Sequence, residues 1–356
     1  MGTGQWLGRL VLAVLLAPWL LPVLLSAPAS AATYSGLVVL GDSLSDQGNM
    51  LAATAALGPG LGGSTPQPDP AAYYQGRFSN GPVYTDVLAK DLGVSLTPSL
   101  DGGTNFAFGG ARTDYNTVEV PPYGTQIFPR EAYPWSLNGE RQAFTAYAAA
   151  NGANPNALYV VFSGSNDVFD IVARGMPVAS TIANAVAGII NVVDAFKAAG
   201  AKTVLVPNLP DLGVVPKVTS LEPVDPGISA YVTLLTMEFN TALAAALDAQ
   251  TGVNIIQFDT FDLLKDVVAD PTAYGFTNST DACYSGFVLP DPTATTCANP
   301  NQYVFWDNEH PTTAFATLLG NDFFAAVTDV PEPASVGLLG GGLVVLAGLR
   351  RRLSAF

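Results

Sequence analysis

The stretch LVVLGDSLS, residues 37–45, is the part of the chain that most directly indicates its fold. Its first four residues are apolar, which is typical of a short buried strand. A serine directly after such a strand, where the chain turns toward a helix, is expected at the sheet edge with a free hydroxyl. Its backbone N–H can then face a developing negative charge at the helix N-terminus. Alternatively, Asp42, Ser43 and Ser45 only cap the following helix.

The rest of the chain repeats this pattern of short apolar runs separated by helical stretches. Further strands are predicted over residues 158–162, 203–206 and 253–258, and helices over 83–92, 142–150, 178–199 and 228–249. This alternation predicts an α/β fold with a parallel sheet covered by helices on both faces. Ligands bind such sheets at the carboxyl ends of the strands. Residues 57–70 and 270–300 are expected to be loops.

The chain contains a single histidine, His310, and an aspartate, Asp307, precedes it by three residues. At this spacing the carboxylate can orient the imidazole within one turn and stabilise its protonated form. The following proline disfavours helical geometry at His310 and suits a helix over residues 311–327. The sequence therefore predicts His310 as a base for Ser43, with Glu309 as the close competitor of Asp307 for the orienting role.

Two other segments offer N–H groups that could stabilise a negatively charged oxygen. Asn166, in the sequence GSND at 164–167, follows the second predicted strand and could point its amide into the same crevice as Ser43. The sequence NFAFGG at 105–110 is a turn whose second glycine, Gly110, permits close backbone approach. Both segments could instead be ordinary turns or helix caps.

These motifs together resemble those of the GDSL esterases and lipases of the SGNH hydrolase superfamily. Gly-Asp-Ser-Leu at 41–44, Asn105 with Gly110, Gly-x-Asn-Asp at 164–167 and Asp-x-x-His at 307–310 occur in the family's order, and the resemblance covers residues 35–328. The sequence GRFSNG at 76–81 is similar to a stretch of the larger bacterial and plant members. The Gly-x-Ser-x-Gly motif of ordinary α/β-hydrolases is absent from the sequence.

The resemblance implies a flavodoxin-like α/β/α fold with a mainly parallel sheet, and hydrolysis of carboxylic esters without a cofactor. Ser43 would be the nucleophile, His310 the base and then the acid, and Asp307 the orienting carboxylate. The N–H groups of Ser43 and Gly110 and the side chain of Asn166 would form the oxyanion hole. Whether Gly109 or Gly110 supplies the backbone donor stays open.

Composition excludes several other functions. A net charge of -15, from 14 basic and 29 acidic residues, argues against nucleic-acid partners. With 2 cysteines and 1 histidine, a zinc site built from those residues is nearly impossible, and no metal is expected. Carbohydrate deacetylase, polyester depolymerase and a non-catalytic exopolysaccharide-associated surface protein remain as alternatives. Nothing in the sequence determines the acyl chain length of the substrate. Five aromatic residues could line an acyl groove or belong to the core: Tyr73, Tyr74, Phe78, Phe106 and Phe108.

Both ends of the chain have the composition of targeting segments. Residues 1–31 contain Arg9, an apolar run over 10–25 and the small residues Ala29-Ser30-Ala31, which is the layout of a secretory signal peptide. A membrane anchor or a buried helix is the alternative. Residues 329–356 contain Pro-Glu-Pro at 331–333, an uncharged run over 334–349 and three arginines at 350–352.

The C-terminal segment resembles the PEP-CTERM sorting signal of Gram-negative bacteria, with a plain membrane anchor as the alternative. The resemblance implies a processing protease of the exosortase class as partner, transient association with the inner membrane and a final location at the cell surface or outside the cell. The expected organisation is therefore a signal peptide over 1–31, a hydrolase domain over 32–328 and a sorting tail over 329–356. In an exported protein, Cys283 and Cys297 are expected to form a disulfide.

Overall fold

The computed structural model describes residues 34–57, 65–119, 125–129 and 135–328. The predicted signal peptide and sorting tail lie outside these residues, as does part of the loop expected over 57–70.

A four-stranded parallel sheet forms the centre of the fold, in the order β1-β4-β5-β6. The strands are β1 (Leu37–Gly41), β4 (Leu158–Phe162), β5 (Thr203–Pro207) and β6 (Asn254–Phe258). All four were predicted from their apolar runs. Every residue of β1 and β4 is buried, which explains why these strands show no alternation of polar and apolar residues.

A short segment around Asn105 extends the sheet beyond β1. The Val39 N–H donates to the Thr104 carbonyl at 3.0 Å, and the Phe106 N–H donates to the Val39 carbonyl at 2.7 Å, in a parallel arrangement. Numbered along the chain, the order becomes 2-1-3-4-5, which is the flavodoxin-like order. The predicted fold class is therefore confirmed.

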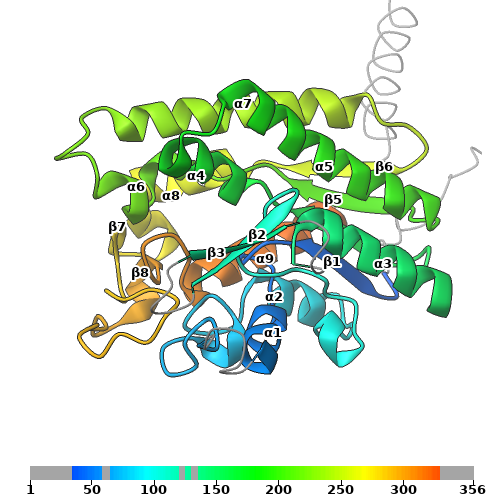
Figure 1. Cartoon of the computed structure of the whole chain (residues 1–356), viewed down its shortest axis with the longest axis horizontal. Coiled ribbons are helices and arrows are strands. Elements are labelled where there is room, and N and C mark those ends of the chain that lie inside the picture. The colour runs from blue at the N-terminus through cyan, green and yellow to red at the C-terminus, as the bar shows by residue number, and fades with distance from the viewer. Residues whose placement is uncertain (1–33, 58–64, 120–124, 130–134, 329–356) are drawn as a thin grey trace, which may run out of the picture. The chain divides into compact units, whose positions relative to one another are not determined.

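Helices cover both faces of this sheet (Figure 1). One face carries α3 (Leu137–Asn151), α4 (Ser165–Arg174), α5 (Val178–Ala198) and α7 (Ile228–Asp248). The other carries α1 (Asn49–Leu57), α2 (Tyr84–Asp91) and α9 (Thr313–Thr328), of which α2 and α9 pack closely together. The short α6 (Pro216–Thr219) and α8 (Thr260–Ala269) lie at the end of the sheet where β7 and β8 are found.

The core accounts for the apolar character of the two longest helices. By length and composition α5 and α7 could each cross a membrane. In this fold, however, Val192, Val193 and Phe196 of α5, and Phe239 and Leu243 of α7, are almost completely buried in the main core. This apolar face is what a helix packed on a sheet requires.

Several elements were not predicted, and their composition explains why. Helix α1 is apolar on all sides, and α4 begins with the polar residues Ser165-Asn166-Asp167, which also suit a turn. Strand β7 (Asn278–Ala282) pairs with β8 (Tyr303–Phe305) inside the segment expected to be a loop. Only the serine of its sequence NSTDA is buried, so the strand needs no apolar run and shows none. A hairpin of β2 (Tyr115–Glu119) and β3 (Thr125–Pro129) was also missed.

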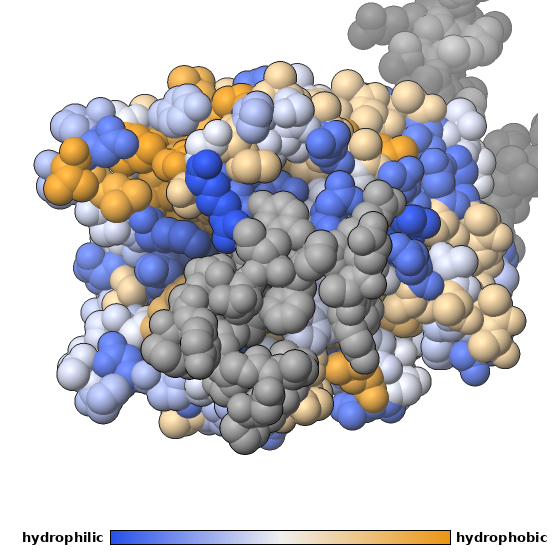
Figure 2. Space-filling view, viewed as in Figure 1, coloured by the Kyte–Doolittle hydropathy of each residue, from blue (hydrophilic) through white to orange (hydrophobic). Residues whose placement is uncertain are grey.

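Exposed hydrophobic residues gather at one end of the view in Figure 2, over α6 and the turn that leads into α7. They include Leu221 and Val224, and Val224 is 81% exposed. This is the end of the sheet to which the carboxyl ends of the strands point, and the candidate site lies there.

Candidate active site

Ser43 lies in the tight turn that follows β1. The Asp42 carboxylate accepts the Leu44 N–H at 3.1 Å, and the Asp42 carbonyl accepts the Ser45 N–H at 3.0 Å. A side chain at Gly41 would place its Cβ 2.3 Å from the Phe162 carbonyl, so only glycine fits between β1 and β4. Since α1 begins at Asn49, Ser43 lies in this turn and not at the helix N-terminus as expected.

His310 and Asp307 lie in the loop between β8 and α9. The Ser43 Oγ is 2.9 Å from His310 Nε2, and His310 Nδ1 is 2.7 Å from Asp307 Oδ2. The other carboxylate oxygen of Asp307 accepts the Glu309 N–H at 2.9 Å and the His310 N–H at 2.7 Å. The structure therefore brings Ser43, His310 and Asp307 into one hydrogen-bonded chain, in which the histidine and aspartate are almost fully buried.

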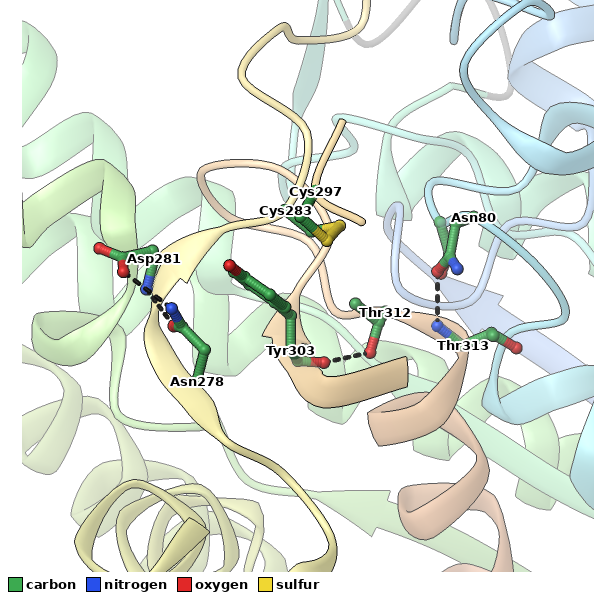
Figure 3. The surroundings of a disulfide bond; sticks show 9 residues. Asn80, Asn278, Asp281, Cys283, Cys297, Tyr303, Thr312 and Thr313 are labelled. Carbon is green, nitrogen blue, oxygen red and sulfur yellow. Dashed lines mark hydrogen bonds between the residues drawn. A yellow bond between two sulfur atoms is a disulfide. The ribbon is translucent and has the colours of Figure 1, made fainter. Parts of the chain in front are cut away.

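The sequence GRFSNG at 76–81 holds the beginning of α9 in place. The Asn80 side chain accepts the Thr313 N–H at 2.9 Å (Figure 3). A Cβ at Gly81 would lie 2.8 Å from the Thr313 side chain, so this approach requires a glycine. The contact holds the loop that carries His310 against the N-terminal half of the domain.

Glu309 does not take the orienting role for which it was a candidate. Its carboxylate pairs with the ammonium of Lys217, and its other oxygen is 3.9 Å from His310 Nε2, on the side away from Asp307. The Lys217 ammonium also lies 4.5 Å from the centre of the Phe169 ring. Glu309 therefore adds a negative charge near the reacting side of the imidazole, while Asp307 determines its orientation.

The charges around His310 shift its pKa and that of Asp307 in opposite directions. Burial alone would lower the pKa of His310, but the hydrogen-bonded Asp307 carboxylate and the charge of Glu309 raise it above its ordinary value of 6.5. Burial opposes ionisation of Asp307, yet His310 and the hydrogen bond from Tyr73 hold its pKa below the usual range. Asp307 is therefore ionised wherever His310 titrates.

Tyr73 contributes a hydrogen bond that the sequence did not suggest. Its hydroxyl donates to Asp307 Oδ2 at 2.5 Å, the same oxygen that contacts His310. The Tyr73 ring is buried and meets the Tyr284 and Trp306 rings edge to face. From the sequence, Tyr73 could line an acyl groove or belong to the core. Neither interpretation included contact with Asp307, because 234 positions separate the two residues.

We predict that Tyr73→Phe lowers kcat/KM about tenfold at neutral pH, since a hydrogen bond to a charged group contributes about 1.5–3 kcal/mol. Without the hydroxyl, Asp307 holds more negative charge against His310, so the pKa of the imidazole rises. The pH–rate profile should therefore shift to higher pH, which a merely structural role would not produce. Tyr74→Phe is the matched control, because Tyr74 is 39% exposed. An unshifted profile would contradict this role.

The candidate oxyanion donors border the same cavity as Ser43 and His310. The Gly109 N–H donates to the Asp46 carboxylate at 2.8 Å. The Gly110 N–H, by contrast, has no acceptor within the described part of the chain. One N–H of the Asn166 amide donates to the Ala111 carbonyl at 3.1 Å, which leaves its second N–H for a ligand. The geometry thus favours Gly110 over Gly109.

Two buried carboxylates hold this backbone in place. Asp46 accepts the N–H groups of residues 48–50 at the start of α1 as well as that of Gly109. Glu140, on α3, accepts the Gly41 N–H at 2.8 Å and the Phe108 N–H at 3.2 Å. Both side chains are fully buried and connect the turn containing Ser43 to the turn containing Gly110.

Aromatic rings enclose the imidazole. Phe78 lies 5.1 Å from the His310 ring, and Phe287 stacks on it at 5.9 Å. Phe287 belongs to the loop closed by the disulfide between Cys283 and Cys297, which is the predicted pairing (Figure 3). Of the other aromatic candidates, Phe106 and Phe108 are buried in core clusters. The disulfide loop therefore forms one wall of the site.

Burial raises the pKa of several acids at the site: Asp42 and Asp167 to about 7, Asp46 to about 6, and Glu140 well above its ordinary value. Such a group binds its proton more tightly in the folded state. Its stabilising contribution is complete below the unfolded pKa, near 3.8 for aspartate, and is lost as pH rises through the folded pKa. The raised pKa of His310 acts in the same direction above 6.5.

We therefore predict that the free energy of unfolding decreases between pH 5 and pH 8, and that the urea midpoint is lower at pH 8. Asp307, with its lowered pKa, affects stability only below about pH 4. Asp42→Asn should reduce the difference between the two midpoints, because the amide does not ionise. A midpoint that rises toward pH 8 would contradict the raised pKa values.

No group of three or more acidic, histidine or cysteine side chains in the described ranges is placed to hold a metal ion. What the residues form instead is a chain of hydrogen bonds from a serine through a histidine to an aspartate, at the carboxyl edge of a parallel sheet. Ser-His-Asp hydrolases use this arrangement of side chains.

The chain belongs to the GDSL-like lipase/acylhydrolase family, whose model matches residues 37–323. Residues 329–352 match the PEP-CTERM protein-sorting motif. The two matches agree with both resemblances seen in the sequence.

Similar curated proteins include a thermolabile hemolysin of Vibrio parahaemolyticus, which is 31% identical over 289 residues that cover 78% of this chain and 60% of the hemolysin. Esterase EstA of Pseudomonas aeruginosa is 30% identical, over 85% of this chain and 48% of the esterase. The chain thus spans about half to 60% of the length of these relatives. A GDSL esterase/lipase of Arabidopsis thaliana is 28% identical over 82% of its length. An acetylxylan esterase of Geobacillus stearothermophilus has a similar structure, with 13% identity, a TM-score of 0.42 and coverage of 85% of this chain and all of that one.

Proposed function

We propose that this protein hydrolyses carboxylic esters, with Ser43 as nucleophile, His310 as general base and acid, and Asp307 as the orienting carboxylate. The observation that carries the proposal is the hydrogen-bonded chain of Ser43 Oγ, His310 and Asp307, with distances of 2.9 and 2.7 Å. Membership of the GDSL-like lipase/acylhydrolase family supports the same reaction class.

In the first half of the reaction, His310 Nε2 removes the proton from Ser43 Oγ as this oxygen attacks the ester carbonyl. The carbonyl oxygen becomes negatively charged and accepts hydrogen bonds from the Ser43 and Gly110 N–H groups and the Asn166 amide. When the bond to the alcohol oxygen breaks, the imidazolium donates its proton to that oxygen. The alcohol leaves, and the acyl group remains on Ser43.

In the second half, His310 removes a proton from a water molecule that attacks the acyl carbonyl. The resulting tetrahedral intermediate uses the same three N–H donors. Its collapse breaks the bond to Ser43 Oγ, which regains a proton from His310, and the carboxylic acid is released. Asp307 stays ionised throughout, because its pKa lies below the usual range.

The test is hydrolysis of p-nitrophenyl butyrate by the full-length protein, together with labelling by diethyl p-nitrophenyl phosphate, which modifies activated serines. Mass spectrometry of the labelled protein should locate one diethylphosphoryl group on Ser43. Turnover of the ester without modification of Ser43 would contradict this mechanism.

We predict that Asn166→Ala lowers kcat about 100- to 1000-fold, because one oxyanion donor is lost. Asn166 lies in the first turn of α4 and is partly exposed, so the substitution should change the thermal midpoint little. Asn151→Ala, at the exposed end of α3, is the matched control. Full activity of Asn166→Ala beside an inactive Ser43→Ala would remove Asn166 from the oxyanion hole.

We also propose an organisation of signal peptide (1–31), hydrolase domain (32–328) and sorting tail (329–356). The match to the PEP-CTERM motif supports export in a Gram-negative bacterium and processing by an exosortase-type protease. The tail would associate briefly with the inner membrane through residues 334–349, and cleavage near 331–333 would leave the hydrolase at the cell surface or in the medium. Mass spectrometry of the extracellular protein tests this, and a C-terminus that extends to Phe356 would refute it.

A further inference from the structure

Two cavities of different character meet at Ser43. Both are bordered by Ser43, Asn166, Phe169, Glu309 and His310, so a group bound to the Ser43 oxygen has access to each. An ester carbonyl at Ser43 carries two substituents, an acyl chain and an alcohol. Each of the two substituents can therefore occupy one of the two cavities.

The first cavity is apolar and extends into the core. Its walls include side chains from the η4 segment (Leu212–Val214) and the residue before α6, and from α8, β8 and α9, all 7% exposed or less: Leu212, Val215, Leu264, Phe305, Phe315 and Leu319. The charged groups on its wall, Asp42, Glu309 and His310, belong to the turn containing Ser43 and the loop before α9. Away from Ser43, a ligand in this cavity contacts mainly carbon atoms.

The second cavity, called the charged cavity below, has a mixed lining in which apolar side chains such as Phe78 and Phe287 stand beside several charged groups. Arg112 and Arg174 both pair with Asp170, at 2.6 and 3.1 Å, and Lys217 pairs with Glu309. An alkyl chain that reached these ion pairs would displace water from them without offering a hydrogen bond, which is unfavourable. A polar group with hydroxyl or charged substituents could instead bond to them.

We propose that the apolar cavity binds the acyl chain and the charged cavity binds the alcohol portion, so that the substrate is an ester of a medium- or long-chain fatty acid with a polar alcohol. This inference rests on the proposed ester hydrolysis and extends it to the substrate class. Acetyl esters would leave the apolar cavity unfilled and forgo the contacts that its walls offer.

The proposal has a quantitative consequence for the intact protein. Burial of one methylene contributes about 0.8 kcal/mol, which corresponds to a three- to fourfold gain in binding. Along a series of p-nitrophenyl esters from acetate to decanoate, kcat/KM should rise about threefold for each added methylene until the chain fills the cavity. The alcohol is the same throughout the series, so the change reports on the acyl side alone.

Variants in the wall of each cavity show which of the two cavities binds the acyl chain. Leu264→Phe adds volume to the wall of the apolar cavity and should lower the octanoate-to-acetate ratio of kcat/KM at least tenfold. Val215→Phe, on the α6 side, is a second variant of the same cavity if the first does not fold. Ala173→Phe narrows the charged cavity near its exposed rim and should leave this ratio unchanged.

The outcomes separate this inference from the proposed function on which it rests. If diethyl p-nitrophenyl phosphate labels Ser43 and acetate is hydrolysed, but kcat/KM does not rise with chain length, the inference is wrong and ester hydrolysis stands. A ratio that changes in Ala173→Phe and not in Leu264→Phe would place the chain in the charged cavity and also overturn it. Absence of both hydrolysis and labelling would contradict the two proposals together.

Discussion

Ser43→Ala is expected to lower kcat for ester hydrolysis about a million-fold, which is the scale seen when a triad nucleophile is removed from a serine hydrolase. His310→Ala should cause a similar loss, because the chain has no second histidine to act as base. The two residues act on one proton in one step, so their effects are not additive. The double variant should therefore be no less active than either single variant.

Stopped and continuous assays with p-nitrophenyl butyrate give kcat for each variant, and thermal unfolding shows that the fold is retained. Ser180→Ala, on the exposed side of α5, is the matched serine control. A double variant far less active than either single variant would show that Ser43 and His310 contribute independently. That result is incompatible with proton transfer between them.

The second large effect is expected for Asp307→Asn, which should lower kcat about ten-thousand-fold. Asp307 is surrounded by donors only: two backbone N–H groups, the Tyr73 hydroxyl and His310 Nδ1. An amide has one acceptor oxygen, so its NH₂ group must face a donor or turn the imidazole to the wrong tautomer. The pKa of His310 should also fall, since the carboxylate that raises it is gone.

This prediction is checked by measuring kcat from pH 5 to pH 9 for the variant and for Asp322→Asn. Asp322 lies on α9 and takes no part in the hydrogen bonds of the site. A decrease of less than tenfold for Asp307→Asn would show that another group orients His310. Glu309 is poorly placed for this, because its carboxylate faces Nε2.

The sheet and the three residues of the hydrogen-bonded chain could be predicted because their signals are local. Buried parallel strands such as 158–162 are continuous apolar runs, and Asp307 lies three residues from His310. Strand β7 and helix α4 were missed because their sequences also suit loops and turns, and only tertiary packing makes them regular.

The supporting groups could not be predicted for a different physical reason. Asp46 and Glu140 accept hydrogen bonds from backbone N–H groups, and every residue except proline carries such a donor, so the sequence does not show which one a carboxylate will bind. The choice between Gly109 and Gly110 likewise depends on which N–H Asp46 occupies. Every tyrosine has a hydroxyl, so the sequence does not show that the hydroxyl of Tyr73 contacts Asp307. Only the three-dimensional structure shows this contact.

The distance along the chain between Ser43 and His310 has a consequence for the time at which the protein becomes active. They are 267 positions apart, and the loop that carries His310 is held in place by Asn80 and by the packing of α9 on α2. At a synthesis rate of about 5–20 residues per second, the ribosome adds His310 roughly ten seconds to a minute after Ser43. In the proposed mechanism, Ser43 has no general base during that interval. Ester hydrolysis in this mechanism therefore begins only when α9 docks and brings His310 to Ser43.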